Sequence, residues 1–125
     1  MHPAETTVRA FLAAVDANDL DRIMGCFAED AVYHNIPVQP VTGTAAIRAV
    51  LQSFLSLASR VQWVTHYLAV TQDGVVLTER TDRFLVRGRW IELPVMGAFE
   101  VADGRITAWS DYFDMKQFQG QMAAA

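Results

Sequence analysis

The segment from Thr78 to Phe84 is rich in charge, yet an apolar triplet precedes it and another follows it. Its valine, threonine and phenylalanine content favours a β-strand, in which residues two apart share a face. Arg80 and Asp82 then point the same way, next to Val76 and Phe84. A surface ladder of alternating charges is one interpretation. The other is a buried ion pair, because charge inside a protein is costly unless it is paired.

A second segment, around Asp111, favours the buried interpretation. Alternation places Thr107, Trp109, Asp111 and Phe113 on one face, so Asp111 is an acid among aromatic rings unless this strand is exposed. Arg80 between two carboxylates would partly satisfy all three groups. Burial and a neighbouring carboxylate raise the pKa of one acid, while a nearby cation keeps the other ionised. Two carboxyl groups with separated pKa values can serve as acid and base.

A third segment supplies neutral polar groups. Tyr33 and Asn35 are two residues apart on a short predicted strand, so they share a face, while His34 faces the other way. Their hydroxyl and amide groups could hold a water molecule next to the acid pair. The alternative for each residue is a polar core side chain that is satisfied by its neighbours.

The elements that must position these residues begin with helices. Apolar residues spaced three and four apart predict a helix over Pro3–Ala17 and a second one after the Asn18-Asp19 cap, ending at Glu29-Asp30. A third helix is expected to open at Gly43-Thr44, with Thr44 as its cap. A short helix capped by Asp114 should run through Phe118.

Alternating sequence predicts the strands, at residues 31–36, 61–70, 75–86, 90–101 and 105–113. Pro94 suggests a bend or bulge, and Asp103-Gly104 a tight hairpin. Helices followed by a meander of strands indicate an α+β fold, with helices on one face of a curved, mostly antiparallel mixed sheet. Such a sheet forms a cone whose wide end is a natural site for a small molecule.

Composition excludes several classes of protein. The 125 residues suggest one domain, residues 1–125, and a net charge of −4 with no basic cluster argues against nucleic-acid binding. The single Cys26 and an N-terminus without signal-peptide features predict a cytoplasmic protein. No segment is long and apolar enough to span a membrane. His2, His34 and His66 lack ligand spacing, so neither a metal site nor a cofactor is expected.

Three motifs in this order resemble the limonene-1,2-epoxide hydrolases. They are Tyr33-x-Asn35-x-Pro37, Glu79-Arg80-x-Asp82 and Trp109-x-Asp111-Tyr112-Phe113-Asp114. The resemblance extends from the first helix to the last. It implies a cystatin-like cone fold, a homodimer formed through the sheet, and hydrolysis of an epoxide to a diol in one concerted step without a nucleophilic aspartate.

The resemblance also implies a role for each polar residue. Asp82 matches the general acid that protonates the epoxide oxygen, and Asp111 the general base that takes a proton from water. Arg80 matches the arginine that bridges them, while Tyr33 and Asn35 match the residues that position the water. The expected apolar wall of the substrate site comprises Leu12, Val15, Phe54, Phe84, Leu93, Val95, Phe113 and Phe118.

Two other functions fit the same expected fold. A ketosteroid-isomerase-like or polyketide-cyclase-like enzyme would use one acid or histidine as a base and would need hydrogen-bond donors for an enolate oxygen. A non-catalytic domain that binds a small ligand is the third possibility. It would leave the convergence of five polar side chains unexplained.

Overall fold

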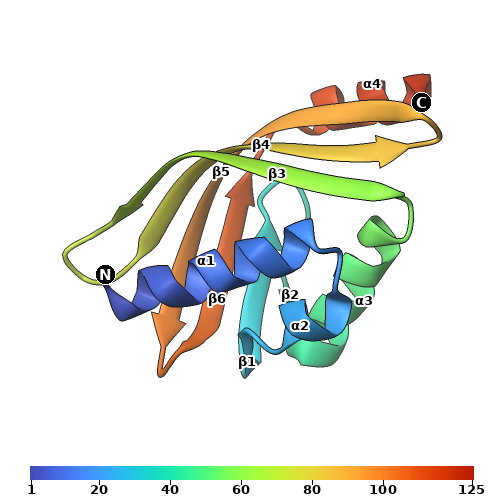
Figure 1. Cartoon of the computed structure of the whole chain (residues 1–125). Helices are drawn as coiled ribbons and strands as arrows, with labels where there is room; N and C mark the ends of the chain where they lie inside the picture. The colour runs from blue at the N-terminus through green and yellow to red at the C-terminus, as the bar shows by residue number, and fades with distance from the viewer.

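The computed structural model describes residues 1–125 and contains one six-stranded sheet, in the order β2-β1-β6-β5-β4-β3 (Figure 1). Only β1 and β6 run parallel to each other, and the other neighbours are antiparallel. The α+β prediction with a mostly antiparallel, curved sheet is therefore confirmed. The strands are β1 (Phe27–Asn35), β2 (Val41–Thr42), β3 (Arg60–Val70), β4 (Val76–Val86), β5 (Arg89–Ala102) and β6 (Arg105–Tyr112).

Three helices precede the long strands and a fourth follows them: α1 (Pro3–Asp16), α2 (Leu20–Met24), α3 (Thr44–Leu55) and α4 (Met115–Ala124). Helix α1 lies across the inner face of the sheet, and α4 lies at the end of β4 and β5 near the C-terminus (Figure 1). Asp19 caps α2 and Asp114 caps α4, both through side-chain oxygens that accept backbone N–H groups. No helix has the length and apolar character needed to cross a membrane.

The boundaries of several elements differ from the prediction. Helix α2 ends at Met24, and Phe27 begins β1 instead of extending the helical stripe to Glu29-Asp30. Phe27 pairs with Ile106 of β6, so a tertiary contact overrides the local helical pattern. The cap of α3 is Gly43, at φ 91°, without a side-chain hydrogen bond, so the prediction of Thr44 as cap was wrong.

Three further features of the strands and of α4 were not anticipated. The short strand β2 pairs with β1, although no strand was predicted between residue 36 and the third helix. Strand β5 passes Pro94 without losing register against β4, and its register shift falls between Glu100 and Val101, against β6. Helix α4 continues past Phe118 to Ala124, and Gln121 exchanges two hydrogen bonds with the backbone of Glu92 on β5.

Aromatic side chains fill the space between α1 and the sheet. Phe11 of α1 is fully buried and packs edge-on against Phe27, Phe99 and Trp109. Such pairs contribute about 0.5–1.5 kcal/mol each beyond their area burial. This cluster fixes Trp109, and with it the strand that carries Asp111.

Candidate active site

Strand β4 turns its charged residues inward. Thr78, Arg80, Asp82 and Phe84 are all buried, and the residues between them are more exposed. Arg80 is 1% exposed and Asp82 5%. The interpretation of this segment as a surface ladder is therefore excluded, and the predicted inner face is confirmed.

All five N–H groups of Arg80 have acceptors. Nε and Nη2 donate to Asp82 Oδ1 and Oδ2, each at 2.9 Å. Nη2 also donates to Asp111 Oδ2 at 2.7 Å, while Nη1 donates to Asp111 Oδ1 at 3.2 Å and to Thr78 Oγ1 at 3.1 Å. A guanidinium has five N–H donors, so none remains free for another ligand. The predicted bridge between the two aspartates is present.

The two carboxylates differ in their surroundings. Asp82 accepts hydrogen bonds from Arg80 alone, whereas Asp111 also accepts one from Trp109 Nε1 at 2.7 Å. The indole of Trp109 is itself stacked on the Tyr33 ring, with centroids 4.0 Å apart. Donors to a carboxylate stabilise its charged form, so Asp111 is better supported as an anion than Asp82.

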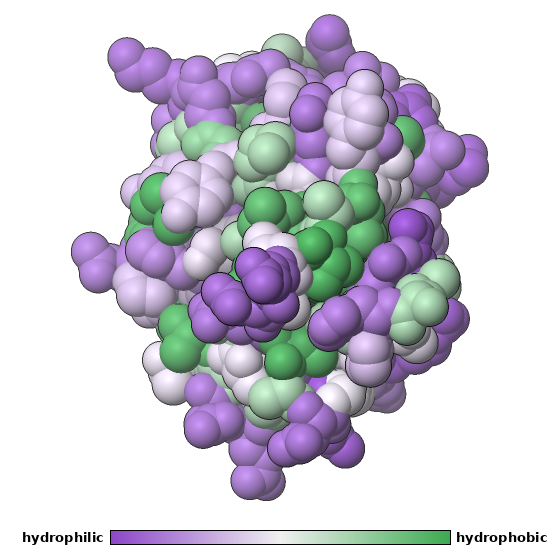
Figure 2. Space-filling view, turned by 90° about the vertical axis from the view of Figure 1, so that its left-hand side faces the viewer, coloured by the Kyte–Doolittle hydropathy of each residue, from purple (hydrophilic) through white to green (hydrophobic).

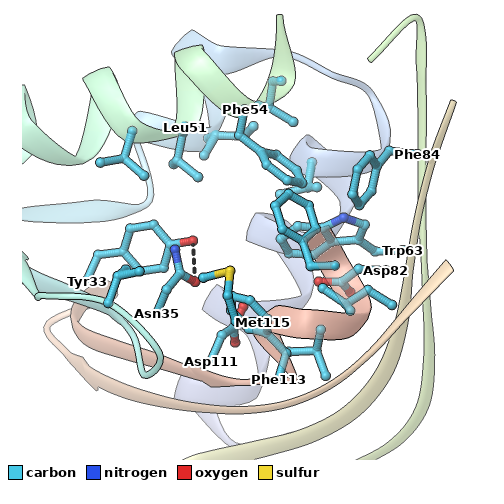
Figure 3. Close-up of a pocket in the computed structure, with 18 residues that line it drawn as sticks. Tyr33, Asn35, Leu51, Phe54, Trp63, Asp82, Phe84, Asp111, Phe113 and Met115 are labelled. Atoms are coloured by element: carbon cyan, nitrogen blue, oxygen red, sulfur yellow. Dashed lines mark hydrogen bonds between the residues drawn. The ribbon is translucent and has the colours of Figure 1, made fainter. Parts of the chain in front are cut away.

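The parallel pairing of β1 with β6 delivers the neutral polar groups. Tyr33 lies opposite Trp109, and Asn35 lies opposite Asp111. The Tyr33 hydroxyl donates to Asn35 Oδ1 at 3.0 Å, as the dashed line in Figure 3 shows. Burial, with the negative charge of Asp111, raises the pKa of Tyr33 above its ordinary value, so the hydroxyl keeps its proton.

Burial also shifts the charged groups of the site. It raises the pKa of Asp82 from 3.8 to about 6, because the effect of desolvation exceeds the opposing effect of Arg80. Burial disfavours the Arg80 cation as well, but the charges of Asp111 and Asp82 outweigh it and raise the pKa of Arg80. The site therefore holds a permanent cation beside a carboxyl group that can carry a proton near neutral pH.

A glycine makes this arrangement possible. Gly97 of β5 lies opposite Thr78 on one side and Asp111 on the other. A Cβ atom at this position would stand 2.5 Å from Arg80 Nη1, 2.6 Å from Asp111 Oδ1 and 3.0 Å from Thr78 Oγ1. The missing side chain thus leaves the space in which the guanidinium meets Asp111.

The polar groups open into an apolar cavity with a volume of about 150 Å³ (Figure 3). Asn35, Asp82 and Asp111 line it, together with the hydroxyl-bearing ring of Tyr33. Every member of the predicted wall except one is also in the lining: Val15, Phe54, Phe84, Leu93, Val95, Phe113 and Phe118. Leu12 is the exception, because it packs in the hydrophobic core under α1 and does not reach the cavity.

Sequence reasoning missed part of the lining: Ile23, Val38, Val50, Leu51, Leu55, Trp63 and Met115. Val50, Leu51 and Leu55 of α3 are spaced one, four and five residues apart, as on the apolar face of a helix. This spacing predicts a buried face but does not predict that the face borders the cavity. Trp63 could have been found by alternation along β3, where it pairs with Asp82. No group of three or more His, Cys, Asp or Glu side chains is placed to hold a metal ion.

Comparison with known proteins shows which family the chain belongs to. The model of the limonene-1,2-epoxide hydrolase catalytic domain matches residues 2–123. The chain belongs to the limonene-1,2-epoxide hydrolase family. Epoxide hydrolase EphG of Mycobacterium tuberculosis is 36% identical over 109 residues, which are 86% of this chain and 71% of EphG.

Solved structures agree with this assignment. An LEH-like epoxide hydrolase of M. tuberculosis is 32% identical and superposes with a TM-score of 0.83, covering 97% of this chain and 90% of the other. SalBIII, an epoxide hydrolase/cyclase-like enzyme of pyran ring formation in the polyether salinomycin, is 19% identical with a TM-score of 0.83, covering 91% of this chain and 92% of its own. At that identity, SalBIII shows a shared fold only. This protein is thus an epoxide hydrolase-like enzyme of the limonene-1,2-epoxide hydrolase family.

Proposed function

We propose that this protein adds water to a neutral, hydrophobic epoxide in one step and releases a vicinal diol. The proposal depends on one observation: Arg80 forms two hydrogen bonds with Asp82 and two with Asp111, and both aspartates line an apolar cavity. This arrangement offers an acid and a base to opposite ends of one displacement. Each such proton transfer typically contributes about 10²–10⁴-fold.

Asp82 is the proposed general acid. A carboxyl group with a pKa of about 6 carries a proton in part of the population at neutral pH and can give it to the epoxide oxygen as the C–O bond breaks. The proton moves from Asp82 to the alkoxide oxygen that forms. Arg80 stabilises the carboxylate that remains.

Asp111 is the proposed general base. Hydrogen bonds from Arg80 and Trp109 favour its charged form, and its carboxylate lines the cavity. A water that donates one proton to Asp111 and the other to Tyr33 Oη or Asn35 Oδ1 has a lone pair free to attack the epoxide carbon. The water oxygen then forms the new C–O bond, and its proton passes to Asp111.

The donor inventory of Arg80 argues against the isomerase or cyclase alternative. An enolate would need donors aimed at its oxygen, and Arg80 cannot supply one, because its five N–H groups already bind Asp82, Asp111 and Thr78. Protonated Asp82 is then the one acidic donor of the pair, which is fewer than the several donors of a typical oxyanion site. A protein that only binds a ligand would have no use for a pair of buried carboxyl groups with different environments. One epoxide-hydrolase-like domain over residues 1–125 remains our interpretation of the chain.

The lining determines the proposed substrate class. Apart from Tyr33, Asn35, Trp63 and the two aspartates, the lining is entirely aliphatic, aromatic or thioether. No cation is free to bind a carboxylate, so a charged group on the substrate would lose its hydration without compensation. A terpene-like or lipid-derived epoxide fits these conditions, and limonene oxide is one member of that class.

We also propose a homodimer formed through the outer face of the sheet. The side of the molecule that faces left in Figure 1 has hydrophobic residues near its centre and hydrophilic residues around them (Figure 2). On the outer face of the sheet, Tyr67, Met96 and Tyr112 are each more than half exposed and stand in one row across β3, β5 and β6, with Glu79 of β4 between them. Burial of these side chains against a second copy of the chain would remove their apolar surface from water.

Light scattering tests the dimer. The wild-type protein should have twice the mass of one chain, and Met96→Lys should shift it toward the monomer, whereas Leu57→Lys, another exposed apolar residue outside the sheet, should not. A wild-type monomer at micromolar concentration would contradict the dimer. A cytoplasmic location stays a prediction from the single cysteine.

Product analysis tests the activity. The purified protein should convert limonene oxide or cyclohexene oxide to the diol, with no added metal or cofactor, and should be inactive on an enone isomerisation substrate. Epoxides that carry a carboxylate next to the ring should react poorly. Isomerisation without diol formation, or a preference for charged epoxides, would overturn the proposal.

A further inference from the structure

Asp16 places a negative charge at the end of α1. It is the last residue of the helix, and no basic residue lies in the last helical turn. None of the ion pairs of the protein includes Asp16. The C-terminal end of a helix carries a partial negative charge, which favours a cation and repels a carboxylate. The sign of the charge at this position therefore calls for an explanation.

One hydrogen bond explains the position of Asp16 but not its charge. Asp16 Oδ1 accepts the backbone N–H of Trp63 at 2.7 Å. Trp63 lies on β3, the edge strand of the sheet, so Asp16 binds one of the N–H groups that an edge strand leaves unpaired. The amide oxygen of an asparagine would accept the same hydrogen bond without repulsion by the helix. The negative charge is not required for this contact.

The pairing of β3 with β4 brings that charge close to the proposed acid. Trp63 lies directly opposite Asp82. Opposite residues of antiparallel strands have Cα atoms about 4.5–5.5 Å apart, so the Asp16 carboxylate lies within about 10 Å of the Asp82 Cα atom. Repulsion between two carboxylates at this separation is weak in water and stronger when one of them is buried, as Asp82 is.

Few charged groups act on Asp82. Burial raises its pKa most, and Arg80 on the same strand opposes this effect. The negative charges of Asp111 on β6 and Asp16 on α1 add to the increase. Tyr33 of β1 keeps its proton, and no other charged side chain lines the cavity. Asp111 is itself the proposed base, so Asp16 is the acid that can influence Asp82 without taking part in the reaction.

We propose that Asp16 is a positioning residue for the acid step, whose negative charge increases the protonated fraction of Asp82 at neutral pH. This inference rests on the proposed function, in which Asp82 gives its proton to the epoxide oxygen. Asp16 does not line the cavity, so it acts through Asp82 and not on the substrate. The same charge that is unfavourable at the end of α1 then serves the reaction.

Two substitutions separate the charge of Asp16 from its hydrogen bond. Asp16→Asn removes the charge and keeps an acceptor for the Trp63 N–H, whereas Asp16→Ala removes both. In both variants the limb of the kcat/KM profile that falls with rising pH should move to lower pH, by about 0.3–1 pH unit for one charge at this distance. Well above the midpoint, kcat/KM should therefore fall about 2- to 10-fold, and the loss should shrink toward lower pH. A purely structural role would instead give Asp16→Asn a wild-type profile and Asp16→Ala a lower rate at every pH.

Asp103→Asn is the matched control. It removes the same charge in the turn between β5 and β6, where the backbone has a φ of 51° that asparagine also adopts. Asp103 is not among the groups that act on Asp82, so the profile should stay as in the wild type. Thermal unfolding checks the fold of the test variant: Asp16→Asn should melt no lower than the wild type, because the repulsion at the end of α1 is gone.

Salt gives a second test of the charge. Raising the ionic strength from about 0.01 to 1 M shortens the Debye length from about 30 to 3 Å, so it should reduce the difference between the profiles of the wild type and Asp16→Asn. A difference that is the same at both ionic strengths would contradict an effect of the exposed Asp16 charge.

A titration of Asp82 itself tests the inference without turnover. In protein labelled with ¹³C-aspartate, the carboxyl signal that is missing from Asp82→Asn is followed by NMR across pH. Its midpoint should be lower in Asp16→Asn than in the wild type, by the same amount as the kinetic limb. This shift without any epoxide turnover would support the role of Asp16 and reject the hydrolase. Equal midpoints in the two proteins, or a wild-type kinetic profile in Asp16→Asn, would overturn the role of Asp16.

Discussion

Asp82 and Asp111 bind the same guanidinium from different strands, and their roles follow from what else each one touches. Asp111 gains a third donor, Trp109 Nε1, whereas Asp82 has only Arg80 against the cost of burial. The better-supported anion is suited to accept a proton, and the less stable one to give a proton away. Because both residues are aspartates, the difference in their roles comes from their surroundings and not from the residue type.

Replacing either carboxyl group with an amide should remove one of the two proton transfers. Asp82→Asn and Asp111→Asn should each lower kcat by at least about 10²–10⁴-fold, because both transfers occur in one step. Tyr33→Phe should lower kcat less than either aspartate variant, because the attacking water keeps Asn35 and Asp111 as hydrogen-bond partners. Diol formation under saturating substrate measures kcat, and circular dichroism checks the fold. Near-normal turnover by Asp111→Asn would remove that residue as the base.

The pH dependence of kcat/KM should report Asp82. The acid acts in its protonated form, which is populated below its folded-state pKa of about 6. The rate constant should therefore fall as pH rises through about 6, approaching a tenfold loss per pH unit. Initial rates between pH 4 and 9 with a neutral epoxide measure this limb. A rate that rises through pH 6 and stays constant above it would contradict Asp82 as the acid.

At the scale of the elements, alternation along strands was the reliable signal. It correctly predicted that Arg80 and Asp82 share an inner face with Phe84, because the side-chain period of a strand is two. It could not predict that Gly97 lies between Thr78 and Asp111, because that depends on the registers of three strands. The prediction made α2 too long, because Phe27 continues the apolar spacing of that helix. Phe27 instead pairs with Ile106 of β6, a long-range contact that the local sequence does not reveal.

The register around Gly97 leads to a prediction about β5. Gly97→Ala should place a methyl group 2.5–2.6 Å from Arg80 Nη1 and Asp111 Oδ1, so the guanidinium must move away from Asp111. Misplacement on this scale should lower kcat about 10²-fold. Diol formation under saturating substrate measures this loss.

Gly120→Ala is the matched control for this variant. Gly120 lies on α4, where an added Cβ meets nothing within 4 Å, so activity and pH profile should stay as in the wild type. Equal activity of Gly97→Ala and Gly120→Ala would show that the space beside Arg80 does not matter for the reaction.

At the scale of the whole molecule, topology assembles the site. The parallel contact of β1 with β6 brings Asn35 opposite Asp111 although 75 residues separate them in the chain, and strands β4 and β5 carry the remaining parts. The sequence patterns predicted the elements and their inward residues, but not this pairing. Leu12 was misplaced for the same reason, since a helix pattern does not say which part of its apolar face borders a cavity and which part packs in the core.

The most direct test of direct attack by water is a single turnover with enzyme in excess in water labelled with heavy oxygen. The account predicts that the diol carries one heavy oxygen from the first turnover, and that peptides containing Asp82 or Asp111 carry none. An attack by an aspartate would instead transfer its own unlabelled oxygen to the product and leave the label in the enzyme after ester hydrolysis. Unlabelled diol together with a labelled aspartate peptide would contradict the one-step mechanism.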